Sequence, residues 1–455
     1  MGGPLPHPSH CREPGRLNTF IGIDLGTSGC RAIAIDETAN VKALASVPLP
    51  PPDRPQAGHS QQDPERWWQV VTQLLRRLGE TCKGCHFAAI AVDGTSSTLL
   101  LSDPQGEPIT PALMYNDSRS REILTKLKQV APEDSPVLNA GSGLAKLLYL
   151  RQQISAKRYF ALHQADWIAG KLCDRFPLSD ENNALKLGYD PVRREWPAWM
   201  AGLDIAPETL PQVSPSAIPI GRLSRQAAAV TGLKSGIPIV AGTTDGNAAF
   251  LATGAAEIGD AVTSLGSTLV LKILSDTPVF AAEHGIYSHR LGNSWLVGGA
   301  SNSGGAVLHA YFDEAQTQSL TLRLEPEQPT GLDYYPLLRP GERFPVNDAD
   351  YPPRLHPRPA SDLLFFQAIL EGVAKIESKG YRLLQRLGAP KPSRVLSIGG
   401  GAHNEPWRMI REQALGIPVI RAAQQEAAYG TALLAMQGTG APLGTIASLF
   451  RPHAG

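Results

Sequence analysis

The hydrophobic positions near the start of the chain form two runs that a short polar turn separates. Residues 20–35 read FIGIDLGTSGCRAIAI, and the break falls between Asp24 and Ser28. Two apolar runs joined by a glycine-rich turn predict a strand, a turn and a strand. Residues 87–103 show the same order of strand, Asp-Gly-Thr-Ser and strand. A carboxylate at the end of a buried strand is costly without a partner, so we expect Asp24 to have one.

Apolar residues at helical spacing predict several helices. Residues 64–80 begin with Pro and Glu, which is typical of a helix start. Residues 361–388 predict a longer amphipathic helix with Ser361 as its N-cap. Shorter helices are predicted at 119–130, 144–156 and 160–171, and Pro-rich loops at 47–64 and 337–359.

The second half of the chain repeats the pattern of the first. A strand, a turn with Asp245 and a helix start are predicted at 237–255, and a strand, a glycine turn and a strand at 259–274. LGTS at 25–28 resembles LGST at 265–268, which indicates a weak internal duplication. Strand, triple glycine and helix follow at 394–416. Strands alternating with helices predict an α/β fold, here with two similar lobes that meet near residue 250.

Composition narrows the class of protein. The 455 residues include 42 Lys and Arg and 42 Asp and Glu, and this balance argues against partners such as nucleic acid or a membrane surface. No apolar run has the length of a membrane span. Residues 1–18 lack the apolar core of a signal peptide, so we expect a disordered extension. Five scattered cysteines do not indicate a disulfide framework, and a reducing cytoplasm is the expected location.

Three turns of glycine and hydroxyl residues follow predicted strands, at 26–29, 266–268 and 399–401. Glycine lets backbone N–H groups approach an anion, and Ser or Thr adds donors, so the set favours a phosphate site. Tight turns alone are the alternative for each one. The sequence contains neither a P-loop motif nor a Rossmann fingerprint with its downstream acid.

Two other segments have more than one interpretation. CKGCH at 82–86 matches a haem-attachment string or half of a zinc site, but no second ligand pair exists, so we expect a loop. The polar cluster SDENNALKLGYD at 179–190 is predicted to be a solvated turn, with the wall of a cleft as the alternative.

An ordered set of motifs carries a resemblance to a known family. The motifs are GIDLGTSGCRAIAID, AVDGTSSTLLL, LMYNDSR, AGTTDGNAAFLATGA, SLGSTLVL, RPGERFP, IGGGAHN and EAAYGTALLA. In this order they resemble the FGGY family of carbohydrate kinases. The resemblance implies two ribonuclease-H-like lobes of the actin and hexokinase superfamily, at 19–253 for sugar and 254–455 for nucleotide, with a central cleft between them. It also implies transfer of phosphate from ATP, with Mg²⁺, to a sugar hydroxyl.

The resemblance implies roles for particular residues. Asp24 would hold Mg²⁺, and Asp245 would be the general base for the sugar hydroxyl. Gly26, Thr27 and Ser28 would approach the transferring phosphate, with Thr27 also catalytic and Arg31 nearby. The remaining nucleotide contacts would come from Gly266, Ser267, Thr268, Gly400, Gly401, Asn404 and Trp407. Sugar contacts would come from Asp24, Thr95, Ser96 and Asp245, with Asn116, Asp117 and Arg119 in a segment that often lines the pocket.

The sugar is less sharply indicated than the reaction. Thr95-Ser96-Ser97 stands where xylulose kinases generally carry Gln-Met-His, and the stretch resembles that of ribulose kinases. We therefore expect a pentulose kinase that forms D-ribulose 5-phosphate, acting as a monomer or homodimer. The alternatives are a D-xylulose kinase, an inactive sugar- or nucleotide-binding regulator on the same scaffold, and an ATPase of the actin or heat-shock type.

Overall fold

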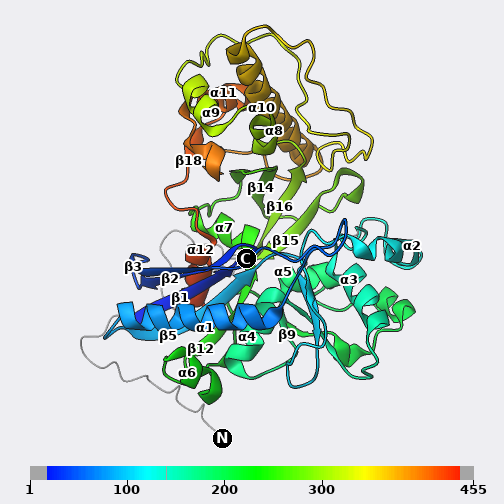
Figure 1. Cartoon of the computed structure of the whole chain (residues 1–455), viewed down its shortest axis with the longest axis vertical. Helices are drawn as coiled ribbons and strands as arrows, with labels where there is room; N and C mark the ends of the chain where they lie inside the picture. Colours follow the sequence, from blue (N-terminus) through cyan, green and yellow to red (C-terminus); the bar gives the residue numbers. More distant parts are fainter. Residues whose placement is uncertain (1–17, 140, 441–455) are drawn as a thin grey trace, which may run out of the picture.

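The computed structural model describes residues 18–139 and 141–440, in which two six-stranded sheets dominate (Figure 1). The first sheet has the order β11(Pro219–Arg222), β12(Pro238–Thr244), β5(His86–Gly94), β1(Asn18–Leu25), β2(Gly29–Asp36), β3(Val41–Pro48). The second has the order β15(Tyr287–Leu291), β16(Ser294–Ser301), β14(Leu269–Ser275), β13(Asp260–Leu265), β17(Arg394–Ile398), β18(Val419–Arg421).

The two sheets share one topology. In the first, β1, β2 and β3 pair antiparallel, and β5 and β12 are added parallel to β1. In the second, β13, β14 and β16 pair antiparallel, and β17 and β18 are added parallel to β13. The duplication predicted from LGTS and LGST therefore extends over five strands of each sheet. The predicted two-lobed α/β fold is confirmed.

Local sequence explains the main helices. At the start of α1(Pro64–Thr81) the Asp63 side chain accepts the Glu65 N–H. Pro64 fits the first turn because the N–H that proline lacks would have no partner within the helix there. An apolar stripe from Trp67 to Leu78 is buried. In α10(Asp362–Arg386), Ser361 caps the Leu364 N–H as predicted. The other helices are α2(Leu124–Leu127), α3(Gly143–Leu150), α4(Gln164–Cys173), α5(Glu181–Ala184), α6(Arg225–Thr231), α7(Asp245–Ala252), α8(Gly305–Tyr311), α9(Glu314–Thr321), α11(Glu405–Leu415) and α12(Ala427–Gln437).

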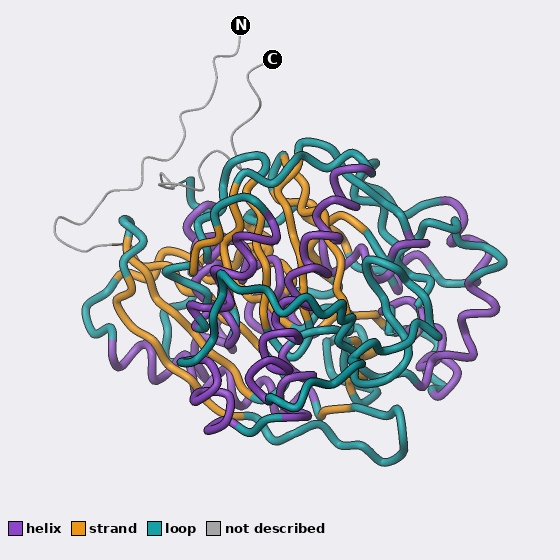
Figure 2. Tube along the Cα trace, turned by 90° about the horizontal axis from the view of Figure 1, so that it is seen from above, coloured by secondary structure: helices purple, strands orange, loops and turns teal. Residues whose placement is uncertain are grey.

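Helices α7 and α12 lie between the two sheets, in the middle of the molecule (Figure 1). Although α12 is late in the sequence, it packs on β1, β2 and β5 of the first sheet. A hydrophobic cluster continues from Phe20 and Ile33 through α12 to Val262 and Leu274 of the second sheet. Viewed along the long axis, the strands run through the interior with helices on both sides (Figure 2). Each lobe has a main core of its own, and this further cluster joins the two.

Two segments differ from the prediction. β5 and β6(Leu99–Ser102) belong to different sheets, because β6 pairs with β8(Phe160–His163) in a four-stranded sheet with β7(Ala112–Leu113) and β4(Gln61–Gln62). The helix predicted at 160–171 begins only at Gln164, because residues 160–163 pair with β6. A small parallel pair, β9(Leu178–Asp180) and β10(Gln212–Ser214), completes the sheets of the described residues.

The predicted extension, residues 1–18, lies outside the described residues except for Asn18, which begins β1. Among residues 18–139 and 141–440, no helix combines the length and apolar character that crossing a membrane requires.

Candidate functional site

Two carboxyl groups lie side by side at the ends of neighbouring strands. Asp24 of β1 and Asp93 of β5 are direct partners in the parallel ladder. The sequence analysis did not select Asp93, which is fully buried and accepts a hydrogen bond from Thr431 of α12. Burial raises the pKa of Asp24 to about 6, and burial together with the charge of Asp24 raises the pKa of Asp93 well above its usual range. Of the two carboxyls, Asp93 is the one whose pKa is raised further, and a hydrogen bond that it donates when protonated lowers the pKa of Asp24.

This pair has no counterpart in the second lobe. Ser264 stands at the position of Asp24, and its ladder partner on β17 is Ile398. Both lobes therefore have the glycine turn, but only the first lobe has carboxyl groups, Asp24 and Asp93, at these two strand positions.

Asp245 is the first residue of α7, directly after β12. Its carboxylate accepts the Gly246 N–H at 2.6 Å and also the Ser96 N–H. Burial raises the pKa of Asp245, while these hydrogen bonds and the cations Lys272 and Lys186 oppose the rise. The charges of Asp245 and Asp24 also act on one another. The structure therefore brings Asp24, Asp93, Asp245 and the 94–98 loop together.

The 94–98 loop is fixed by its neighbours, and Ser96 stands out within it. The N–H and the hydroxyl of Thr95 both donate to Gln164 Oε1, at 2.9 and 2.8 Å. Lys146, fully buried, donates to Ser97 O at 2.8 Å and so holds a residue with a φ of +68°. By contrast, the Ser96 hydroxyl is buried and has no hydrogen-bond partner among the described residues.

These contacts distinguish the hydroxyls of Thr95 and Ser96, both of which were predicted to bind the sugar. Because the Thr95 proton is already donated to Gln164, Thr95 acts as a structural support of the loop. The prediction that Thr95 donates to a sugar is therefore not kept, whereas Ser96 remains a candidate.

The segment 116–119 makes internal contacts. Asp117 is fully buried, accepts the Ser60 N–H at 2.7 Å and pairs with Arg119 at 2.8 Å. This pair fixes the segment that follows β7.

The first glycine turn closes on itself beside Asp24. Gly26 N–H donates to Gly29 O at 2.9 Å, Thr27 is half-buried, and Ser28 is exposed. Arg31, on β2, forms an exposed ion pair with Glu426 at 2.7 Å, just before α12.

The second glycine turn is backed by a segment that the sequence analysis missed. Gly305 N–H donates to Gly266 O at 2.9 Å, and Ala306 N–H donates to Ser267 O at 3.1 Å. Gly304 has a φ of +147°, and a Cβ there would lie 2.8 Å from Ser267 O. The signal in the sequence was the Gly-Gly pair that follows the apolar strand before α8. The turn of Gly266, Ser267 and Thr268 thus rests on the start of α8.

The third glycine turn, at 399–401, is open at Gly400, but the nearby Trp407 is not an adenine contact. Gly399 has a φ of +86°, and Gly400 faces open space, where a Cβ would meet nothing within 4 Å. Trp407 is only 2% exposed, its indole N–H donates to Leu370 O, and its ring lies against Gly401. Because the ring is covered by protein, Trp407 is a core residue and cannot flank an adenine. Asn404 is the N-cap of α11, where its side chain accepts the Trp407 N–H.

Residues 179–190 are also not a solvated turn. Asp180, Glu181 and Asn182 are buried. The Asn182 side chain donates to Arg290 O at 2.8 Å and accepts the Arg290 N–H at 2.9 Å. It therefore joins the first lobe to β15 of the second. CKGCH is the turn between α1 and β5, and its His86 is the first residue of β5.

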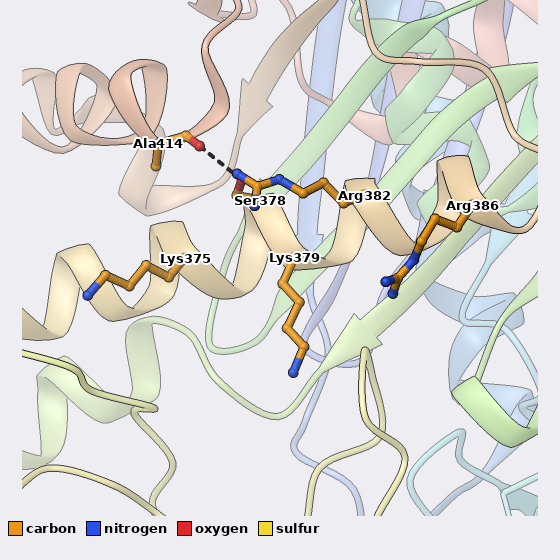
Figure 3. A pocket seen from close by; sticks show the side chains of 6 residues that line it. All are labelled: Lys375, Ser378, Lys379, Arg382, Arg386 and Ala414. Atoms are coloured by element: carbon orange, nitrogen blue, oxygen red, sulfur yellow. Dashed lines mark hydrogen bonds between the residues drawn. The ribbon is translucent and has the colours of Figure 1, made fainter.

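A groove of ≈ 450 Å³ lies along α10 (Figure 3). It is lined by Lys375, Ser378, Lys379, Arg382, Arg386 and Ala414. None of the predicted site residues contributes to it, so it is not part of the candidate site.

Comparison with known proteins identifies the family. The N-terminal domain model of the FGGY family of carbohydrate kinases matches residues 19–252, and the C-terminal domain model matches residues 261–438. The chain belongs to the FGGY family. A xylulose kinase of Escherichia coli (strain K12) is 26% identical over 410 residues, which cover 86% of this chain and 84% of the relative. A gluconokinase of Bacillus licheniformis is 23% identical, covering 92% and 88%.

A solved structure agrees with these matches. The crystal structure of a "xyloylose kinase" from Brucella ovis has a TM-score of 0.86 and 26% identity, and the match covers 96% of this chain and 93% of that one. This FGGY protein is therefore a carbohydrate kinase, a phosphotransferase that uses ATP with Mg²⁺.

The residues of this FGGY kinase fit a hydrated Mg²⁺. Among residues 18–139 and 141–440, no three His, Cys, Asp or Glu side chains gather into a metal cluster. Mg²⁺ is usually held by one or two carboxylates and keeps several waters, so a full cluster is not required. The charge of Asp24 raises the pKa of Asp93, and the charge of Asp245 raises the pKa of both, so a divalent cation beside Asp24 would relieve repulsion among these carboxyls.

Proposed function

We propose that this FGGY kinase phosphorylates the terminal hydroxyl of a pentulose, with D-ribulose as substrate and D-ribulose 5-phosphate as product. The observation that carries the proposal is the position of Asp245, whose carboxylate is held by the Ser96 N–H at the end of β5. The proposed base Asp245 thus lies next to Ser96, whose hydroxyl has no partner among the described residues. Asp24 and Asp93, carboxyls of the kind that bind Mg²⁺, are close by.

In this proposal Asp245 accepts the proton of the attacking sugar hydroxyl. Its pKa is raised by burial, and a raised pKa makes a carboxylate a better general base. The Ser96 hydroxyl, buried and without a partner among the described residues, would donate to a neighbouring sugar oxygen and orient the sugar.

The remaining residues would hold the nucleotide. ATP with Mg²⁺ supplies the phosphoryl group and neutralises its charge when bound. Asp24, supported by Asp93, would hold the hydrated cation, and Gly26, Thr27 and Ser28 would approach the transferring phosphate. Gly266, Ser267 and Thr268 would bind the other phosphates, and Gly400 and Gly401 the adenosine. The proposed lobes are 19–253 for the sugar and 254–455 for the nucleotide.

The choice of sugar rests on residues 95–97. Xylulose kinases generally carry Gln-Met-His where this chain has Thr95-Ser96-Ser97, which favours D-ribulose. D-xylulose is the second candidate, because similar proteins are named xylulose kinase.

A coupled assay of ADP release with D- and L-ribulose, D- and L-xylulose, glycerol and gluconate tests both candidates. We expect the highest kcat/KM with D-ribulose. A preference for D-xylulose would overturn the sugar assignment alone, and a lack of stimulation by every sugar would indicate an inactive regulator. Ser96→Ala should raise the KM for the sugar about tenfold, the cost of one lost hydrogen bond to a polar substrate. Ser97→Ala is the matched control, since Lys146 binds the backbone carbonyl at 97.

A further inference from the structure

A lysine of the second sheet reaches the helix that carries Asp245. Lys272 lies on β14, and its Nζ donates to Asn247 Oδ1, on α7, at 2.6 Å. Asn247 is fully buried, and its Nδ2 donates to Thr243 Oγ1 at 3.2 Å, so its amide is oriented with Oδ1 toward the lysine. The lysine therefore has a fixed partner two residues after Asp245.

The chain leaves room for this lysine. Gly246 follows Asp245 directly, and a Cβ at Gly246 would lie 3.1 Å from Lys272 Nζ. A Cβ at 246 would therefore require Lys272 Nζ to shift by a few tenths of an ångström. The first turn of α7 thus packs closely against Lys272 Nζ.

The charge of Lys272 acts on Asp245. The groups that act on Asp245 include the cations Lys272 and Lys186, the N–H groups of Gly246 and Ser96, the carboxyls of Asp24 and Asp93, and the Tyr287 hydroxyl. Lys186 lies over the Tyr287 ring, 3.5 Å from its centroid. Burial lowers the pKa of Lys272 to about 7, and the charge of Asp245 opposes this. His289, also close to both lysines, has a pKa held well below its usual value by burial.

We propose that Lys272 is a positioning residue for phosphoryl transfer, which fixes the first turn of α7 through Asn247 so that Asp245 faces the sugar hydroxyl. It acts through Asn247 and Asp245 and does not contact the sugar. This inference rests on the proposed role of Asp245. Because Lys272 lies on the second sheet, it makes the geometry of the base depend on the lobe that binds the nucleotide.

Steady-state kinetics of Lys272→Met, Asn247→Ala and the double variant test the proposal. Each single variant should lower kcat about tenfold, because a small displacement of a catalytic group is costly, while the KM for ATP stays within about twofold. The double variant should lose little more than either single variant, because both remove the same contact. Losses that multiply to about a hundredfold would overturn the proposal, as would an unchanged kcat in Lys272→Met.

Three further variants make the result specific. Lys272→Arg should recover part of kcat. Gly246→Ala, which keeps the lysine but crowds its Nζ, should lower kcat in the same direction by a smaller factor, and it serves if Lys272→Met fails to fold. Lys379→Met is the matched control, since that lysine points into solvent from α10 (Figure 3). If the wild-type protein shows no sugar-dependent ADP release, the proposed function fails; if the wild type is active and Lys272→Met is equally active, only this inference fails.

Discussion

Gly22→Ala should destabilise the protein and lower its activity, although Gly22 contacts no predicted ligand. Gly22 lies in the middle of β1, and α12 crosses directly over it. A Cβ at Gly22 would lie 2.0 Å from Ala428 O and 2.2 Å from Ala432 N. Carbon and oxygen atoms approach no closer than about 3.3 Å, so α12 would have to retreat by roughly 1.3 Å.

Two costs follow from that displacement. Overpacking of a well-packed core costs about 1–3 kcal/mol. Thr431, on α12, would also lose its hydrogen bond to the buried Asp93, which costs about 1–3 kcal/mol more. We therefore expect the free energy of unfolding to fall by about 2–6 kcal/mol, and kcat to fall with it, because Asp93 supports Asp24.

Urea denaturation followed by tryptophan fluorescence measures the loss. The control is Gly79→Ala, in the last turn of α1, where a Cβ would make only an ordinary contact of 3.4 Å with Leu233. That variant should be more stable than the wild type by up to about 1 kcal/mol, because Ala favours a helix. If Gly22→Ala unfolds at the same urea concentration as the wild type, the close packing of α12 on β1 is refuted.

Two further predictions concern buried charges. The pKa of Lys146 is lowered to about 7 by burial, so between pH 7 and its ordinary 10.5 the unfolded chain binds more protons and stability rises with pH. The free energy of unfolding of the wild type, relative to that of Lys146→Met, should therefore rise by up to about 1.4 kcal/mol per pH unit across that window. Urea titrations at several pH values measure it, and a difference that stays constant with pH would contradict the prediction. Arg411 and Glu377, both buried, form a bidentate pair at 2.6 and 2.7 Å. Arg411→Met should lower the free energy of unfolding by about 3–5 kcal/mol, because it leaves an unpaired buried carboxylate, and a loss below about 1 kcal/mol would contradict this.

The sequence predicted the features that depend on local pattern. The hairpin at 20–35, the helix at 64–80 and the cap at Ser361 follow from periodicity and capping chemistry, and each is present. The family motifs gave both lobes, and the glycine turns and Asp245 stand at the ends of strands as the pattern indicated.

What the sequence could not show depends on contacts between distant segments. Asp93 belongs to the site because β5 pairs with β1 in a register that sets it against Asp24. The polar cluster at 179–190 looked solvated because its partner, Arg290, lies far along the chain. Trp407 is covered through its contact with α10, and Thr95 is bound by Gln164. In each case a tertiary contact decides between two interpretations that the local sequence leaves equal.

The most direct test of the account is sugar-dependent ADP release by Asp245→Asn. The account predicts that this variant loses at least about a hundredfold in kcat with D-ribulose, the range of a lost general base, while calorimetry shows ADP binding close to that of the wild type. A variant that keeps most of its rate would contradict the assignment of Asp245 as the base and, with it, the proposed site.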